Sequence, residues 1–140
     1  MDCDLHKAKA YLASENCTCV LCRGERLVYS HHRGVRPLLE FLDSGEDFSG
    51  FSAADKVVGR ATAFLYCLLG VRAVHAGVLS DGAAAVFEQA DIAYTCDRQV
   101  AGIRNRDDTG PCPMEHATKD LDDPQAALEA IHATLKRLKN

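Results

Sequence analysis

The sequence predicts a single α/β domain with a mixed, mainly parallel sheet that is covered by helices on both faces. Three observations predict it: an opening β-hairpin, an alternation of helices and strands after the hairpin, and a valine-rich run at 71–79 that suits a strand buried on both faces. The 140 residues fit one domain with one hydrophobic core, and no repeat or long linker divides them.

The first part of the chain predicts a helix, a hairpin and a second, short helix. Apolar residues recur on one face of residues 4–14, which is typical of an amphipathic helix. Residues 17–22 and 26–30 are predicted strands, joined by a tight turn that contains glycine. A short helix follows between Gly34 and Gly45.

The strongest helix signal lies between Ser52 and Gly70. Ser52 and Asp55 have the spacing of a capping box, in which the serine accepts a bond from the third backbone N–H and the acid reaches back. Gly70 is a natural C-terminal cap. Because this segment is apolar on most sides, we expect it to be the buried central helix.

The rest of the chain alternates between apolar runs and capping signals. The predicted elements are a strand at 71–79, a helix from Ser80 or Asp81 through Phe87, strands at 92–96 and 99–103, and a final helix that starts at Asp123-Pro124.

Composition excludes several classes of protein. A net charge of −4 provides no basic surface for a phosphate backbone, so we expect no nucleic-acid partner. The longest apolar run, at 61–71, is too short for a membrane span, and the N-terminal residues lack the apolar region of a signal peptide. We therefore expect no membrane association and a cytoplasmic protein, whose seven cysteines are mostly buried free thiols.

The cysteines and histidines do not predict a metal centre. Cys17, Cys19 and Cys22 lie on a predicted strand, with the first two facing one side and Cys22 the other, so they do not converge as zinc ligands do. The adjacent pair at 31–32 is expected in an exposed loop, and His75 in the core. We therefore assign no metal and no cofactor.

The beginning of the predicted central helix is a candidate anion site. A buried helix N-terminus has unpaired N–H groups and a partial positive charge, and Lys56 and Arg60 would share one face beside it. Gly59 costs about 1 kcal/mol in a helix interior relative to alanine, so it indicates close approach by another group. That group is either a ligand or a closely packed part of the chain, and both alternatives remain open.

Residues 105–121 hold several reactive groups between prolines and a glycine, where we expect no regular element. Cys112 near an arginine or histidine is a candidate nucleophile, and Glu115 is a candidate general acid or base. The structural alternative is that Cys112 fills a gap in the core while the charged residues around it are solvated.

Two segments resemble a small bacterial family of unknown function that is placed in the cytidine deaminase-like superfamily. They are DKVVGRATAFLYCLLGVRAVHAGVLS at 55–80 and IRNRDDTGPCPME at 103–115. The resemblance implies a three-layer α/β/α sandwich around a mixed sheet, and a homodimer.

The zinc ligands of a deaminase are not matched. Such an enzyme needs H-x-E or C-x-E at the start of the central helix and P-C-x-x-C at the next strand–helix junction. The first position here has DKVVG at 55–59, and the second has SDGA at 80–83. The PCPME sequence at 111–115 has Glu115 in place of the second cysteine and follows a different strand. We therefore expect no zinc-dependent deamination.

The resemblance instead implies a pocket at the carboxyl ends of the strands, with Cys112 and Glu115 as the reactive groups. The ligand-binding residues that it implies are Asp55, Lys56, Gly59, Arg60, Ser80, Asn105 and Arg106.

Three functions compete. The first is a metal-independent pocket for a small polar or anionic, nucleotide-like ligand, with or without catalysis. The second is a regulatory or interaction module that keeps the fold, with its site filled by side chains. The third is a divergent zinc hydrolase that uses Cys112, Glu115 and His75 or His116. We rank them in this order, and whether the protein is an enzyme stays open.

Overall fold

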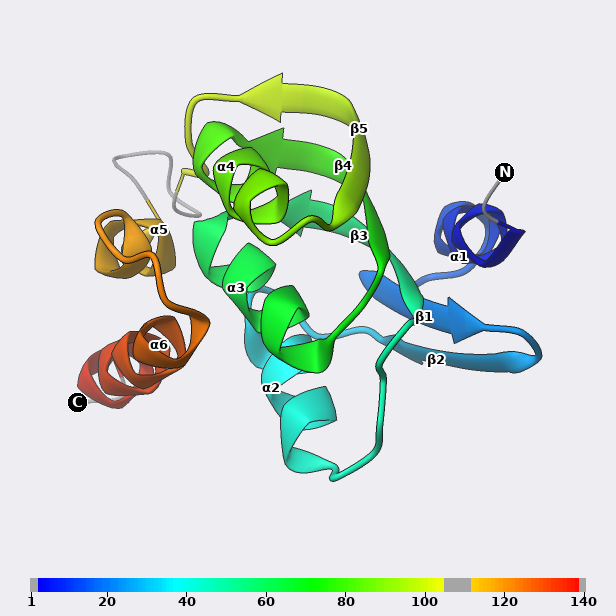
Figure 1. Cartoon of the computed structure of the whole chain (residues 1–140), viewed down its shortest axis with the longest axis horizontal. Coiled ribbons are helices and arrows are strands. Elements are labelled where there is room, and N and C mark those ends of the chain that lie inside the picture. Colours follow the sequence, from blue (N-terminus) through cyan, green and yellow to red (C-terminus); the bar gives the residue numbers. More distant parts are fainter. Residues whose placement is uncertain (1–2, 105–111, 139–140) are drawn as a thin grey trace.

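The computed structural model describes residues 3–104 and 112–138 as an α/β fold with a five-stranded mixed sheet (Figure 1). In chain order, the elements are α1 (Cys3–Ser14), β1 (Cys19–Arg23), β2 (Arg26–Ser30), α2 (Arg36–Asp43), β3 (Ser52–Val58), α3 (Arg60–Leu69), β4 (Ala73–Ser80), α4 (Asp81–Gln89), β5 (Ala93–Val100), α5 (Pro113–Thr118) and α6 (Pro124–Leu138).

The strand order is β2-β1-β3-β4-β5. The β1–β2 hairpin is antiparallel, and β1 is also antiparallel to β3. The β3–β4 and β4–β5 pairs are parallel, with α3 and α4 as their crossover helices. The predicted mixed sheet is confirmed, but only two of its four pairings are parallel, so "mainly parallel" was too strong.

The segment from Ser52 to Val58 is a strand, so the predicted helix over 52–70 was wrong in its first half. This segment pairs with β1 on one side and β4 on the other, and that pairing satisfies its backbone groups. The helix begins at Arg60 after Gly59, which has extended backbone angles, and it ends at the predicted Gly70 cap with φ of 77°. Lys56 and Arg60 therefore lie on different elements and do not share a helix face.

The alternation of side chains between the two faces of the sheet is interrupted near the middle of both β3 and β4. Ala53 and Val58 both belong to the core on the α3 side although they are five positions apart, and so do Ala76 and Leu79 of β4, which are three positions apart. Gly77 permits this interruption, because a Cβ there would lie 2.6 Å from the carbonyl oxygen of Lys56.

Helices pack on both faces of the sheet (Figure 1). The larger core joins one face to α2, α3, α4 and α6, and the smaller core joins α1 to the other face. All three cysteines at 17–22 are buried, but Cys17 lies with Cys22 in the smaller core and Cys19 lies in the larger one. The prediction that Cys17 and Cys19 face the same side of the sheet was wrong. Cys17 precedes the strand, so the alternation of side chains along a strand does not apply to it.

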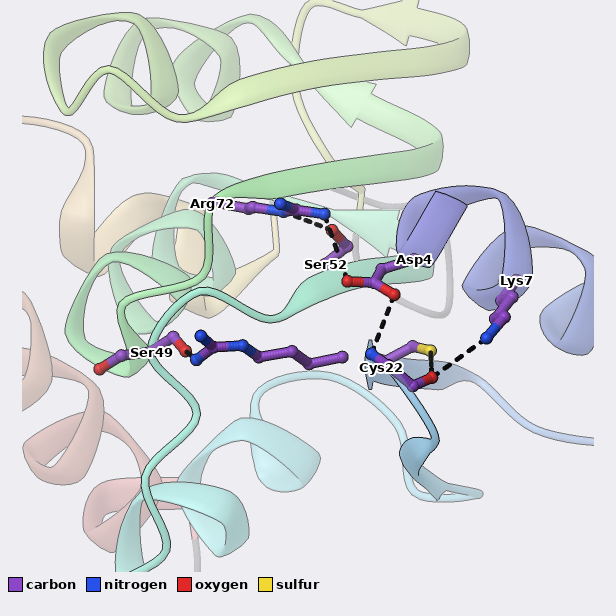
Figure 2. A network of polar contacts seen from close by, with 8 residues as sticks. Asp4, Lys7, Cys22, Ser49, Ser52 and Arg72 are labelled. Atoms are coloured by element: carbon purple, nitrogen blue, oxygen red, sulfur yellow. Dashed lines mark hydrogen bonds and ion pairs between the residues drawn. The ribbon is translucent and has the colours of Figure 1, made fainter. Parts of the chain in front are cut away.

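Polar contacts fix α1 to the end of the sheet (Figure 2). The Asp4 carboxylate accepts a bond of 2.9 Å from the N–H of Gly24 and lies 3.2 Å from the Arg72 guanidinium. Arg72 also donates to Ser52, and Lys7 donates to the carbonyl of Gly24. The N-terminal helix is thereby joined to the hairpin turn and to the segment before β4.

The late part of the chain differs from the prediction in two places. A single strand, β5, replaces the two expected at 92–96 and 99–103. A short helix, α5, occupies part of the stretch where no regular element was expected, because Pro113 stands in its first turn, where a missing N–H costs nothing. Across the described part of the chain, no helix has the length and apolar character needed to cross a membrane.

Candidate functional site

A pocket of about 700 Å³ lies where the carboxyl end of β3 meets the start of α3. This is the edge of a parallel sheet at which α/β proteins usually bind ligands. Its wall combines residues that are far apart in the sequence: those predicted to form the site are Asp55, Lys56, Gly59, Cys112 and Glu115. The segment before β1, the loop after β2, residues 103–104 and the end of α6 complete the wall.

Asp55 is the buried acid of this pocket. Its side chain faces α3, where one carboxylate oxygen accepts a bond of 2.7 Å from the Tyr66 hydroxyl. The other oxygen accepts from the backbone N–H of Val57 at 3.3 Å, within the part of β3 where the alternation is interrupted. Burial raises the pKa of Asp55 to about 7, and the bonds from Tyr66 and Val57 limit the rise. This carboxyl can therefore gain or lose a proton near neutral pH, as groups at functional sites often do.

Tyr66 and Cys19 surround the Asp55 carboxyl on its buried side. The Cys19 sulfur lies 3.2 Å from the Tyr66 oxygen. Burial, together with the nearby carboxylate, raises the pKa of both groups well above its ordinary value. Both therefore stay protonated at neutral pH, and Tyr66 acts as a fixed hydrogen-bond donor to Asp55.

Glu115 fills the space at the N-terminus of α3. Its carboxylate accepts a bond from the backbone N–H of Arg60 and another, of 3.3 Å, from the Ser80 hydroxyl. A Cβ at Gly59 would collide with this carboxylate, so the close approach indicated by this glycine comes from the chain's own Glu115. The negative charge satisfies an orphan N–H group and lies at the positive end of the helix.

Arg60 lies behind the pocket wall. Its guanidinium donates to the carbonyl oxygens of Thr118 at 2.9 Å, Gly82 at 3.0 Å and Leu121, and it stacks over Phe64 at 5.1 Å. The side chain thus fixes the end of α5 against α3 and α4. Its donors are directed at protein carbonyls and, at 3.5 Å, at the Asp122 carboxylate.

Ser80 and Cys112 both lie at helix starts. The Ser80 side chain accepts a bond of 3.0 Å from the N–H of Ala83 and so caps α4, as predicted for that helix. Cys112 is the residue before α5, lies half-buried in the pocket wall, and donates its N–H to the carbonyl of Ile103 at 2.9 Å. Asn105 and Arg106 lie outside the described residues.

Several pocket residues were not predicted from the sequence. The loop after β2 contributes His32 and Arg33, and Arg104 lies on the same wall. His32 and Arg33 are exposed, as expected of a loop, so only the three-dimensional position of the loop reveals their proximity to Asp55. Tyr66, eleven positions after Asp55, had no distinguishing pattern inside an apolar helix.

His75 is buried on the opposite face of the sheet, as expected for a core histidine. Over residues 3–104 and 112–138, no group of three or more histidine, cysteine, aspartate or glutamate side chains is arranged to hold a metal ion. The divergent zinc site of Cys112, Glu115 and a histidine therefore gains no support from the described residues.

The chain is similar to a family of known proteins and to a solved structure. The profile of a family described as a domain of unknown function, DUF1893 (TM1506), matches residues 7–135. The crystal structure of a DUF1893 family protein, TM1506 from Thermotoga maritima, is similar with a TM-score of 0.86 and 21% identity, over 95% of this chain and 91% of that one. At this identity the likeness shows the fold alone. No curated protein matches the chain.

Proposed function

Because the chain belongs to the DUF1893 family, a domain of unknown function, we propose from the site itself that it binds a small polar ligand in the pocket beside Asp55. The observation that carries this proposal is the buried Asp55 carboxyl on the wall of a pocket of about 700 Å³. A buried carboxyl is costly unless it has partners, and the pocket side of Asp55 is where a ligand would add a donor.

The distribution of charge around the pocket supports an anionic group on the ligand. His32, Arg33, Lys56 and Arg104 are basic and lie on the wall. The sequence assigned this anion-binding role to Lys56 and Arg60, and the loop after β2 and residue 104 now replace Arg60 in it. A ligand with hydrogen-bond donors at one end and a phosphate or carboxylate at the other, such as a nucleotide-like metabolite, fits this arrangement.

Apolar side chains at the pocket support a ligand with an apolar body. Val57 and Leu138 are 46% and 57% exposed, and both lie on the pocket wall. Large apolar side chains left exposed beside a pocket favour coverage by a ligand. A planar ring held between them would bury this surface.

Any chemistry in this pocket would use Asp55 for proton transfer, because its raised pKa suits a general acid or base at neutral pH. Cys112 is the candidate nucleophile on the same wall. Glu115 is already bonded to Arg60 and Ser80, so its role is to hold the wall in place.

A more specific fold, the three-layer α/β/α sandwich of the cytidine deaminase-like superfamily, is part of the same proposal. Helices on both faces of the sheet support a three-layer, cytidine deaminase-like arrangement. A bacterial source, a homodimer and a cytoplasmic location are proposed with it. Light scattering on a size-exclusion column would test the homodimer, since a monomer mass would contradict it.

The binding proposal is tested by thermal unfolding and calorimetry with ribonucleoside monophosphates, the corresponding nucleosides and inorganic phosphate. Ligand at 100 times its dissociation constant would stabilise the fold by about 2.7 kcal/mol. We expect Asp55→Asn and Arg33→Ala to weaken binding about tenfold or more, and Arg98→Ala, which changes an exposed arginine on β5, to leave it unchanged. Absence of binding, or equal binding by all variants, would reject the proposal.

Glu115 favours a second candidate, a regulatory module without catalysis. Its carboxylate fills the helix terminus where an anionic ligand would otherwise bind, which is the side-chain filling expected of such a module. Alkylation of Cys112 at neutral pH distinguishes the two. A rate well above that of exposed Cys3 favours chemistry in the pocket, and a slow rate favours the regulatory module.

A further inference from the structure

His75 forms a second polar constellation on the face of the sheet opposite the Asp55 pocket. Its side chain, 8% exposed on β4, has a polar neighbour at each ring nitrogen. Nδ1 lies 2.7 Å from the Thr95 hydroxyl oxygen, and Nε2 lies 3.3 Å from an Asp97 carboxylate oxygen. None of these three residues belongs to the wall of the Asp55 pocket.

The register of the sheet brings these groups together. His75 and Thr95 are direct partners in the parallel β4–β5 pair. Asp97 is two residues further along β5 and therefore lies on the same face as Thr95. The imidazole bridges the two side chains of the edge strand.

The two contacts suit one tautomer of His75. A hydroxyl can donate to a ring nitrogen, so neutral His75 with its proton on Nε2 accepts from Thr95 at Nδ1, and its Nε2–H then lies beside the Asp97 carboxylate, 3.3 Å away. A hydroxyl, a base within hydrogen-bond reach and an acid that orients the base are the parts of an activated nucleophile. Thr95 is also exposed, so a substrate can reach its hydroxyl.

A pocket of about 280 Å³ adjoins His75 and Asp97, and Thr95 lies beside its wall through the contact with His75. His75, Gly77 and Asp97 form one side of it, and Lys9 and Leu12 of α1 lie on the other, together with Lys56 of β3. The volume suits a small acyl group. The Lys9 ammonium group favours a substrate with negative charge, and it favours an oxyanion that develops during reaction.

We propose that Thr95, His75 and Asp97 hydrolyse small anionic carboxylic esters. The Thr95 oxygen attacks the ester carbonyl while its proton passes to Nδ1 of His75, and the C–O bond to the leaving alcohol then breaks as His75 returns that proton to the alcohol oxygen. Water attacks the resulting acyl-threonine and gives its proton to His75, which passes it to the Thr95 oxygen. The net reaction converts ester and water to acid and alcohol. Asp97 is a positioning residue that stabilises the imidazolium.

The test uses the full chain with p-nitrophenyl acetate and its anionic analogue, mono-p-nitrophenyl succinate. We expect turnover with a preference for the anionic ester, and an acyl group on Thr95 in rapidly quenched samples examined by peptide mass spectrometry. Thr95→Ala should lower kcat/KM by about 10²-fold or more, and Thr95→Ser should retain turnover. The Thr95 substitutions change an exposed side chain, and thermal unfolding of each variant checks that the fold is kept.

Asp97→Asn provides a readout that a purely structural role would not change. It should lower kcat with KM and thermal stability unaltered, and Asp97→Glu should recover part of kcat. Acylation of Lys9 or Lys56 without acyl-Thr95, or equal turnover by wild type and Thr95→Ala, would overturn the proposal. Either result would indicate that these three side chains only stabilise the packing of the edge strand β5 against β4.

Discussion

The side chains of Glu115 and Arg60 each bond to a backbone group of the helix that contains the other residue. The Glu115 carboxylate accepts from the backbone N–H of Arg60 at the start of α3, and the Arg60 guanidinium donates to the carbonyl of Thr118 at the end of α5. Each residue therefore satisfies orphan backbone groups of the other's helix. This exchange fixes α5 as a wall of the Asp55 pocket.

Replacement of Glu115 by glutamine tests the charge in this exchange. The amide keeps an acceptor for the Arg60 N–H but loses the negative charge at the helix N-terminus, so we expect a loss of about 1 kcal/mol in the free energy of unfolding. Urea denaturation measures it. The matched control is Glu129→Gln on the exposed side of α6, and an equal effect in both variants would argue against a role for the Glu115 charge.

Gly59→Ala should destabilise the fold by about 1–3 kcal/mol. The added Cβ would collide with the Glu115 carboxylate and lie 3.2 Å from Ile103, although the backbone angles there suit any residue. Gly102→Ala is the control, because its nearest contact, also with Glu115, is an ordinary 3.9 Å. In a double-mutant cycle, Glu115→Ala should remove most of the Gly59→Ala cost, and strict additivity would contradict the proposed collision.

Asp55 should make stability depend on pH. Its pKa of about 7 in the folded state exceeds the usual value of 3.8, so the folded protein binds the extra proton between these values. Stability from this group is therefore present below about pH 4 and is lost as pH rises toward 7, by about 4 kcal/mol at most. Denaturation of wild type and Asp55→Asn across this range measures the difference. Parallel pH profiles for the two proteins would show that Asp55 does not titrate there.

Tyr66→Phe should raise the pKa of Asp55 above its present value of about 7. The lost hydroxyl donates to the ionised carboxylate, so its removal favours the protonated form. Carboxyl carbon chemical shifts, followed by NMR through a pH titration, measure the pKa directly. Tyr94→Phe is the control, because the Tyr94 hydroxyl on β5 donates to exposed Glu88 of α4. An unchanged Asp55 titration in Tyr66→Phe would rule out the hydroxyl as its regulator.

Local signals predicted most of the helices and strands. The Ser80 cap, the Gly70 terminus and the proline start at Pro124 each depend on a few neighbouring residues, and the structure has all three. Residues 52–58 were mistaken for helix because Ser52 and Asp55 have capping-box spacing. Pairing with two strands distant in sequence decided the outcome, and a local pattern does not contain that information.

The arrangement of the site depended even more on distant contacts. The cost of Gly59 inside a helix correctly indicated close approach, but the sequence left its source open. Glu115 is 55 positions from Arg60, and no periodicity relates the two. Asp55 was assigned to a helix start, yet its acid–base character comes from burial against Tyr66, which follows only from the packing of α3 on β3.

The wall of the Asp55 pocket extends from Thr18 near the start of the chain to Leu138 near its end. The pocket can therefore close only after every residue from Thr18 to Leu138 has been synthesised, whatever order the strands fold in. Before α6 is made, α3 and α5 would expose the surface that α6 later covers, where its Ala127 and Ile131 are fully buried. Ligand affinity would then distinguish molecules that contain α6 from molecules that end before it.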